Sequence, residues 1–273
     1  MKPNLLILLL ASLFSTGLYA YSEASYEKNS PDTVLFVGNS FSYFNNGVHR
    51  HYLNLLKASG NWRPGVHRSR LLTLSGGRLS EHSAGIKALI NRENGKAWDI
   101  VVLQEHSTGA IGSNYQQFLL PAITRLLPEI RGIGAEPVLF MTWAYGNKPE
   151  MLNAIIAGYE RVAKQHLLRI APVGLAFAKT ARHYPDISLF TADIVGFDDG
   201  QAIFSNNLKH PSMAGTYLAA CVFYSLLQQT SPQGLDYNPG LSTEHITKLQ
   251  NIAWSTVESY RQVGKTGSEN EPE

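Results

Sequence analysis

The chain has 273 residues, of which 44% are hydrophobic and 16% are charged. That length suits one large domain or two small ones, and the composition supports a sizeable core, which excludes disorder of the whole chain. Lys and Arg total 23 against 21 Asp and Glu, a formal charge of +2. This balance lacks the basic surplus of a nucleic-acid-binding protein. The single cysteine, Cys221, excludes an intrachain disulfide and a multi-cysteine metal site.

Residues 1–24 are predicted to be a secretory signal peptide. Lys2 supplies a positive charge, residues 5–10 form an unbroken apolar run that residues 11–18 extend, and small residues such as Ala24 offer a cleavage site. The alternative is an N-terminal membrane anchor, but the run is short for a span and no later stretch approaches 18 apolar residues. The sequence therefore predicts an exported protein, secreted or periplasmic, with no stable membrane insertion after cleavage.

Short apolar runs alternate with helical patterns along the rest of the chain. Strands are predicted at residues 33–37, 70–74, 99–103, 136–142 and 172–176, and helices at 48–56, 115–130, 149–168, 212–229 and 243–263. Continuous apolar strands between helices favour a parallel sheet covered on both faces. We expect one domain over residues 30–265 and a flexible tail over 266–273. Ligands bind beyond the carboxyl ends of such strands, so the residues after each strand are candidates for the site.

Ser40 and His210 are the first candidates. Ser40 follows the first strand beside Gly38, where its hydroxyl can face the cleft and nearby backbone amides can stabilise an oxyanion. A helix N-cap is the structural alternative for this serine. His210 precedes Pro211, which restricts the backbone, and Ser212, which can cap the next helix. A rigid loop of this kind suits a general base, although an isolated loop histidine is also common.

Together these residues resemble the motifs of the SGNH hydrolase superfamily, the GDSL-like esterases and acetylhydrolases. Residues 38–42, Gly-Asn-Ser-Phe-Ser, are similar to the first motif, whose serine is the nucleophile; Gly76 and Gly77 are similar to the second, whose glycine amide lines the oxyanion hole. Residues 210–220 resemble the last motif, which holds the catalytic histidine, and the resemblance covers about residues 30–228. It implies an α/β fold, a flavodoxin-like three-layer α/β/α sandwich with a five-stranded parallel sheet, and no metal or organic cofactor.

The third motif departs from the usual pattern. Most members have an asparagine there whose amide donates to the oxyanion, whereas residues 101–107 of this chain read Val-Val-Leu-Gln-Glu-His-Ser. Branches with Gln-Glu at this place, including some carbohydrate esterases, are more similar. Gln104 is predicted to supply the same kind of N–H donor; the alternative is a glutamine that only holds a neighbouring loop. His106 lacks a proline-braced loop and is the weaker candidate for the base.

The last motif departs from the pattern at Asn207, three residues before His210, where the superfamily usually has an aspartate. Asn207 can still accept a hydrogen bond through its side-chain oxygen, but an amide favours the wrong histidine tautomer. The remaining hypotheses are a Ser–His dyad, an impaired site, or another carboxylate that orients the ring. The candidates for that carboxylate are Glu105, Asp193, Asp198 and Asp199. Residues 191–207 are long for this connection, which indicates an insertion that displaced the acid.

The predicted function is an exported serine esterase that hydrolyses acyl esters, with acetyl groups on carbohydrate preferred. Ser40 attacks the acyl carbon, His210 transfers the proton, and an acyl-serine intermediate forms. The backbone N–H groups of Ser40 and Gly77 and the Gln104 amide are the predicted oxyanion donors. The partner is thus a small-molecule or glycan ester. The alternatives are a lipid or small-acyl esterase, and a non-catalytic glycan-binding protein with an impaired hydrolase site.

Other reactive or aromatic side chains receive structural interpretations. Cys221 lies in an apolar helical pattern and is predicted to be buried. His49 and His51 are predicted to lie on a helix surface rather than to bind a metal. Trp143 and Tyr145 follow the fourth strand and are either walls of the binding pocket or ordinary core residues.

Overall fold

A computed structural model describes residues 30–90 and 98–269 of the chain. Its central sheet has five parallel strands in the order β2-β1-β3-β4-β5, which is the flavodoxin-like order. The strands are β1 (Thr33–Gly38), β2 (Arg68–Thr73), β3 (Ile100–Leu103), β4 (Glu136–Phe140) and β5 (Arg169–Ala171). The predicted five-stranded parallel sheet is confirmed, whereas the predicted signal peptide lies outside the described residues.

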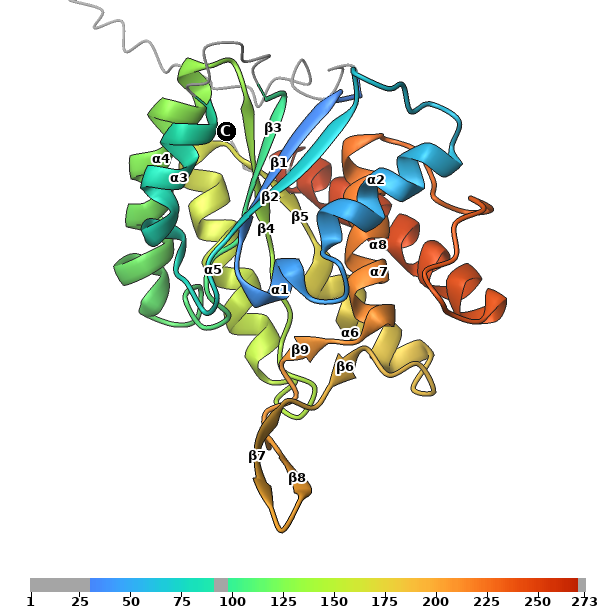
Figure 1. The fold of residues 1–273 in the computed structure, drawn as a ribbon. Coiled ribbons are helices and arrows are strands. Elements are labelled where there is room, and N and C mark those ends of the chain that lie inside the picture. The colour runs from blue at the N-terminus through green and yellow to red at the C-terminus, as the bar shows by residue number, and fades with distance from the viewer. Residues whose placement is uncertain (1–29, 91–97, 270–273) are drawn as a thin grey trace, which may run out of the picture.

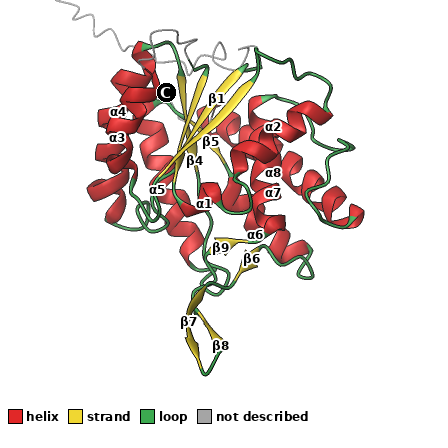
Figure 2. Cartoon of the chain, in the orientation of Figure 1, coloured by secondary structure: helices red, strands yellow, loops and turns green. Residues whose placement is uncertain are grey.

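Helices cover both faces of this sheet (Figure 1; Figure 2). One layer contains α3 (Ser83–Ile90), α4 (Leu120–Gly132) and α5 (Met151–His166); the other contains α2 (Val48–Ala58), α6 (Val173–His183), α7 (Met213–Leu227) and α8 (Thr243–Glu269). The predicted three-layer α/β/α sandwich is therefore confirmed. No helix in the described part of the chain combines the length and the apolar character needed to cross a membrane.

Strand β1 shows why the strands read as continuous apolar runs. Val34 and Phe36 pack into the core beneath α2 and α7, while Leu35 and Val37 pack into the core beneath α4 and α5. All four side chains are buried, because a parallel sheet between two helical layers has no solvent face. The residues after β1 and β3 adjoin each other, since the Gln104 N–H donates to the Val37 carbonyl at 2.9 Å.

The predicted strand at residues 172–176 is wrong. The fifth strand consists of Arg169–Ala171, and Pro172 is the N-cap residue of α6. A five-residue apolar run fits a buried strand and a buried helix equally well, and proline is well tolerated where a helix begins. Helix α3 was not predicted, and α8 continues past its predicted end at Val263 to Glu269, which includes the first residues of the predicted tail.

Two small antiparallel ribbons join α6 to α7. Strand β6 (Phe190–Thr191) pairs with β9 (His210–Pro211), and β7 (Ile194–Asp198) pairs with β8 (Gln201–Phe204). The β7–β8 hairpin projects away from the body of the molecule at the end where the sheet strands terminate (Figure 1). It occupies the segment that the sequence indicated as an insertion.

Candidate active site

Ser40 is positioned by the turn that follows β1. It is the first residue of the short helix α1 (Ser40–Tyr43), and Asn39 caps this helix by accepting the Phe41 N–H on its side-chain oxygen. The same Asn39 residue accepts the N–H groups of Ser42 and Tyr43 on its backbone oxygen. Ser40 is 8% exposed, so its hydroxyl lies at the edge of the buried region rather than in open solvent.

The structure brings His210 to Ser40 across 170 residues of sequence. The distance from His210 Nε2 to Ser40 Oγ is 2.8 Å, which is hydrogen-bonding distance. His210 lies in β9, where it pairs with Thr191 of β6, and Phe44 stacks on its ring with centroids 4.1 Å apart. Backbone pairing and ring stacking together restrict the imidazole to the orientation that faces Ser40.

The second nitrogen of this imidazole meets Asp193. His210 Nδ1 lies 2.5 Å from Asp193 Oδ1, and the two side chains are 13% and 21% exposed. Asp193 lies between β6 and β7, and its carbonyl accepts the Ser205 N–H at 2.8 Å, which closes the base of the hairpin. Ser40, His210 and Asp193 therefore form one continuous chain of hydrogen bonds.

The two acceptors that the sequence named first for His210, Asn207 and Glu105, are not its partners. Asn207 is exposed and forms hydrogen bonds through its own backbone: its N–H donates to Ser205 Oγ and its carbonyl accepts the Lys209 N–H. Glu105 is fully buried and accepts the N–H groups of Leu79 and His106 instead. The displaced-acid hypothesis is the one that the geometry matches, because the hairpin returns the chain so that Asp193 rather than Asn207 faces the ring.

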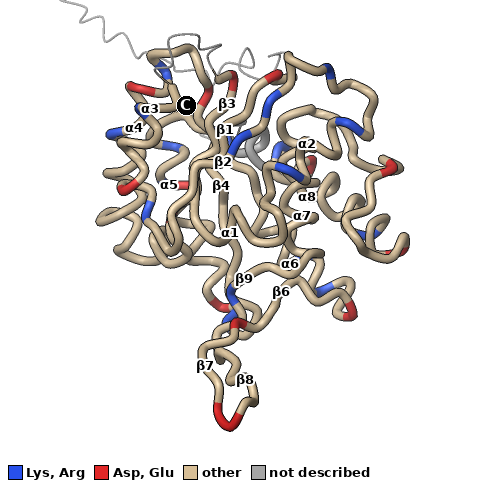
Figure 3. Tube along the Cα trace, in the orientation of Figure 1, with Lys and Arg blue, Asp and Glu red and all other residues tan. Residues whose placement is uncertain are grey.

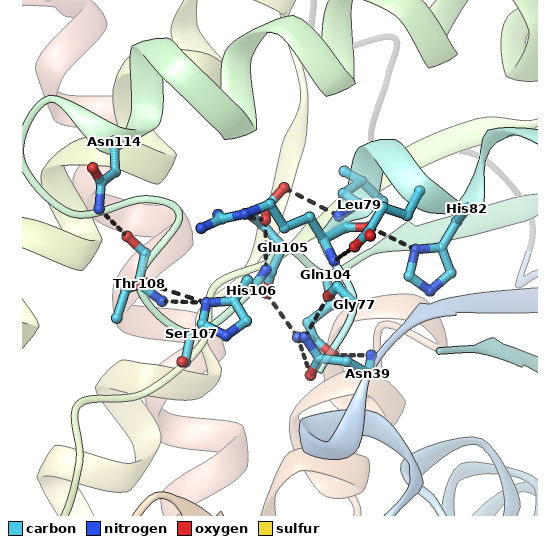
Figure 4. Close-up of polar contacts among 12 residues, drawn as sticks. Asn39, Gly77, Leu79, His82, Gln104, Glu105, His106, Ser107, Thr108 and Asn114 are labelled. Carbon is cyan, nitrogen blue, oxygen red and sulfur yellow. Dashed lines mark hydrogen bonds and ion pairs between the residues drawn. The ribbon is translucent and has the colours of Figure 1, made fainter. Parts of the chain in front are cut away.

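Gln104 has a different set of contacts from the predicted one (Figure 4). Its Nε2 donates to Asn39 Oδ1 at 2.8 Å and to the Glu105 carbonyl at 2.7 Å, which uses both hydrogens of the amide. Its Oε1 accepts from the Asn39 N–H and from Ser42 Oγ, and the side chain is 0% exposed. Both amide hydrogens are therefore engaged, and the side chain holds the turn after β1 against the end of β3; the oxyanion role of Gln104 stays a prediction.

The two backbone donors predicted for the oxyanion differ in availability. The Gly77 N–H donates to the Leu74 carbonyl at 3.1 Å and closes a turn, while the Gly77 carbonyl accepts from Asn39 Nδ2. The Gly77 N–H is thus engaged by the Leu74 carbonyl, and its oxyanion role stays a prediction. Ser40 is the first residue of its helix, where an N–H has no intrahelical acceptor. Of the predicted donors, the Ser40 N–H is the one left for an oxyanion.

Glu105 connects the loops after β2 and β3 (Figure 4). Its carboxylate accepts the Leu79 N–H at 3.3 Å and the His106 N–H at 2.8 Å, and Arg78 Nη1 lies 3.7 Å from Oε1. Burial raises the pKa of the Glu105 carboxyl, and the two N–H groups and the Arg78 guanidinium oppose this shift. His106, the weaker base candidate, contacts Thr108 Oγ1 through Nδ1, and burial lowers the pKa of its ring.

The aromatic residues after β4 divide between two roles. Trp143 is fully buried and stacks between Phe41 and Phe177, with ring centroids 4.4 Å and 4.2 Å away. It is therefore a core residue that supports α1 from beneath, not a pocket wall. Tyr145 is partly buried, and its hydroxyl lies 2.9 Å from Ser107 Oγ, so it joins the loops after β3 and β4.

His51 was predicted to lie on a helix surface, but its side chain is buried at 3% exposure. His51 contacts the Asn45 carbonyl through Nε2 and the Tyr237 hydroxyl through Nδ1, both at 2.7 Å. Cys221 is buried, as predicted, and burial raises the pKa of its thiol. Within residues 30–90 and 98–269, no group of three or more His, Cys, Asp or Glu residues is arranged to hold a metal ion.

Sequence reasoning included Asp193 among four carboxylates but had no means to choose it. The available signal was the unusual length of residues 191–207, which indicated an insertion. Phe44, which stacks on the His210 ring, was not singled out at all. Its position four residues after Ser40 carries no local pattern that distinguishes it from a core aromatic residue.

Comparisons with known proteins bear on the fold. No protein-family model and no curated protein sequence matches this chain. Among solved structures, a DUF4886 family protein from Bacteroides uniformis is similar with a TM-score of 0.60 and 18% identity, covering 82% of this chain and 93% of its own. An acetyl xylan esterase, AlAXEase, is similar with a TM-score of 0.51 and 14% identity, covering 68% and 95% of the two chains.

A third structure, of TesA, has a TM-score of 0.51 and 18% identity, and the match covers 72% of this chain and 98% of TesA. These identities are low, so the likeness establishes a shared three-layer α/β architecture. What this chain does must be argued from its own residues.

Proposed function

We propose that this chain is a serine esterase that hydrolyses acyl esters through Ser40, His210 and Asp193. The observation that carries the proposal is the continuous contact from Ser40 Oγ to His210 Nε2 and from His210 Nδ1 to Asp193 Oδ1. A hydroxyl that shares a hydrogen bond with an imidazole oriented by a carboxylate is the arrangement that activates a serine nucleophile.

In the acylation step, Ser40 Oγ attacks the carbonyl carbon of the ester while its proton passes to His210 Nε2. Asp193 accepts the hydrogen bond from the Nδ1–H and stabilises the imidazolium that forms. The tetrahedral intermediate carries its negative charge on the former carbonyl oxygen, where the Ser40 N–H donates. When the intermediate collapses, the bond to the alkoxy oxygen breaks and His210 returns the proton to the leaving alcohol.

The second step regenerates the enzyme. A water molecule loses a proton to His210 Nε2 as its oxygen attacks the acyl carbon of the acyl-serine. Collapse of this second intermediate releases the carboxylic acid and returns the proton to Ser40 Oγ. Both steps use the same three side chains, and neither step uses a cofactor.

For the substrate, we propose acetyl esters on carbohydrate. Two observations support this class: the Gln104–Glu105 pair resembles the third motif of some carbohydrate esterases, and the fold is similar to that of an acetyl xylan esterase. We further propose export to the periplasm or outside the cell, supported by the charged, apolar and small-residue order of residues 1–24.

The reaction is tested with nitrophenyl acetate and a serine-directed phosphonate. We expect hydrolysis by the wild-type protein, loss of nearly all turnover in Ser40→Ala, and a phosphonyl adduct located on Ser40 by mass spectrometry. Ser42→Ala is a control for labelling, because Ser42 Oγ is buried and donates to Gln104. An adduct on another residue, or wild-type turnover in Ser40→Ala, would contradict the proposal.

The substrate class is tested separately by acetate release from acetylated xylo-oligosaccharides, compared with hydrolysis of long-chain nitrophenyl esters and lipids. Faster turnover of the acetylated sugar supports the proposal. Preference for long acyl chains would favour the lipid esterase alternative. Binding of the sugar without hydrolysis of any ester would favour the glycan-binding alternative.

A further inference from the structure

Glu105 is a buried carboxylate to which the proposed reaction gives no role. Most Asp and Glu residues of the described chain lie on the outer helices and loops (Figure 3), whereas the Glu105 side chain is 0% exposed. It lies two residues after the end of β3, at the edge of the sheet where Ser40 and His210 meet. Burial of an ionised carboxylate is costly unless hydrogen bonds or opposite charges compensate for the lost water. The donors around Glu105 therefore indicate what this carboxylate does.

The Glu105 carboxylate meets donors from two loops. Its Oε1 accepts the His106 N–H at 2.8 Å, within the loop after β3. Its Oε2 accepts the Leu79 N–H at 3.3 Å, and Leu79 begins the short helix η2 (Leu79–His82) that follows the loop after β2. The Arg78 guanidinium lies 3.7 Å from Oε1 and supplies the opposite charge. One carboxylate thus joins two loops that are 26 positions apart in the sequence.

Close packing fixes the Glu105 side chain. A Cβ added to Gly109 would lie 2.4 Å from Glu105 Cγ and 2.8 Å from Oε1, which is closer than real Cβ atoms approach other atoms. The backbone at Gly109 therefore packs directly against the carboxylate and its stem. This backbone is itself held, because the Gly109 N–H donates to the His106 carbonyl at 2.8 Å. The loop after β3 thus fixes the carboxylate, and the carboxylate fixes the Leu79 N–H.

The loop after β2 in turn holds the turn that carries Ser40. The Gly77 carbonyl accepts from Asn39 Nδ2 at 2.9 Å (Figure 4), and Asn39 is the N-cap of α1, whose first residue is Ser40. His82 adds a second connection, because its Nε2 lies 2.8 Å from the Gly38 carbonyl. A displacement of the loop after β2 would therefore move the backbone that presents the Ser40 N–H.

We propose that Glu105 is a positioning residue for the transition state: its carboxylate holds the loop after β2 and, through Asn39, the Ser40 N–H that donates to the oxyanion. This role rests on the esterase reaction proposed above. A carboxylate suits the place because both of its oxygens accept hydrogen bonds, whereas an amide presents a donor at one of the two positions. With N–H groups facing both oxygens, an amide would set two donors against each other on one side.

Glu105→Gln tests this role because it keeps the shape of the side chain and removes one acceptor. The oxyanion exists only in the transition state, so kcat for nitrophenyl acetate is expected to fall while KM changes little. The expected fall is about 10²-fold, the loss that a displacement of about 1 Å can cause. Titration with the serine-directed phosphonate counts the active sites, so kcat is expressed per folded site and partial unfolding does not appear as lost turnover.

Glu136→Gln is the matched control. Glu136 is a partly buried carboxylate with a cationic partner, since Arg169 Nη2 donates to its Oε2 at 3.0 Å. It is the first residue of β4 and lies at the amino ends of the strands, at the opposite edge of the sheet from Ser40. The control therefore weakens a charged contact without touching the loops around the site. It is expected to keep the kcat and KM of the wild type.

Backbone hydrogen exchange, measured by mass spectrometry, follows the contacts without reference to esterase activity. Faster exchange than in the wild type is expected in Glu105→Gln for peptides covering residues 74–82 and 39–44, and unchanged exchange there is expected in Glu136→Gln.

The outcomes separate this role from the esterase proposal. A wild-type protein that hydrolyses no ester would overturn the proposed function and the catalytic part of this role with it. An active wild type and an unchanged kcat per site in Glu105→Gln would overturn the role of Glu105 alone. An equal loss of kcat in Glu136→Gln, or a loss in Glu105→Gln without faster exchange at residues 39–44, would also overturn it.

Discussion

At the scale of single residues, Asp193 contacts the His210 ring although the β7–β8 hairpin lies between them in the sequence. The two residues are 17 positions apart in the sequence, and the strand pair Thr191–His210 sets their separation in space. Asn207, at the usual spacing, bonds through its own backbone to Ser205 Oγ and to the Lys209 N–H instead. The β7–β8 hairpin thus lies between the carboxylate and His210, two positions that the superfamily pattern places three residues apart.

Asp193→Asn is expected to reduce kcat by about 10⁴-fold, the loss that the corresponding change causes in a Ser-His-Asp protease by favouring the wrong tautomer. Asn207→Asp is the matched variant and is expected to leave kcat unchanged, because Asp193 already accepts from Nδ1. Hydrolysis of nitrophenyl acetate measures both. Increased activity in Asn207→Asp, together with full activity in Asp193→Asn, would instead support the impaired-site hypothesis.

At the scale of elements, Gln104 joins the end of β3 to the turn between β1 and α1. Its side chain holds Asn39 from both sides and also accepts from Ser42 Oγ. The turn that positions Ser40 therefore depends on a residue from a neighbouring strand. This role is that of the loop-holding alternative considered from the sequence.

Gln104→Ala is expected to lower the free energy of unfolding by at least about 1–3 kcal/mol, the cost of leaving one buried polar group unsatisfied. Urea unfolding measures this change, and Gln117→Ala, at an exposed position of the η3 helix (Tyr115–Leu119), is the control that should leave stability nearly unchanged. A large loss of turnover with no loss of stability would restore Gln104 to the oxyanion site.

At the scale of the whole molecule, His49 couples folding stability to pH. Burial, followed by the charges of Arg50, Arg70 and His51, lowers the pKa of His49 from 6.5 to about 4. In the unfolded chain His49 takes up a proton near its ordinary pKa, so the unfolded state gains protons first as the pH falls. The folded state holds His49 neutral, so its contribution to the free energy of unfolding is fully present above pH 6.5. This contribution is lost as the pH falls towards about 4.

His49→Gln is therefore expected to lose less stability than the wild type when the pH is lowered from neutral towards this range. Urea unfolding of both proteins at neutral and acidic pH measures the difference. Equal losses of unfolding free energy in the two proteins would show that other groups cause the loss of stability at acidic pH.

Strands β1, β3 and β4 could be predicted from local sequence because each is a short, largely apolar run whose side chains are buried. The same locality explains why Ser40 and His210 were singled out as candidates: Gly38 at the end of β1 and Pro211 after His210 shape the backbone next to them. The run at residues 172–176 was misassigned, because β5 is only three residues long and its neighbouring apolar run belongs to the start of α6. Short apolar runs carry no period that separates strand from helix.

Local sequence patterns predict the layered parallel sheet, and they single out Ser40 and His210 as candidates for a site at the strand ends. Which carboxylate meets His210, and where the Gln104 amide points, follows from the tertiary structure. Those contacts depend on hydrogen bonds between segments far apart in the chain, and an amide or carboxylate binds whichever partner the fold brings within about 3 Å of it. Local sequence encodes backbone preference and burial, whereas the direction of a buried polar group is set by all the elements that pack around it.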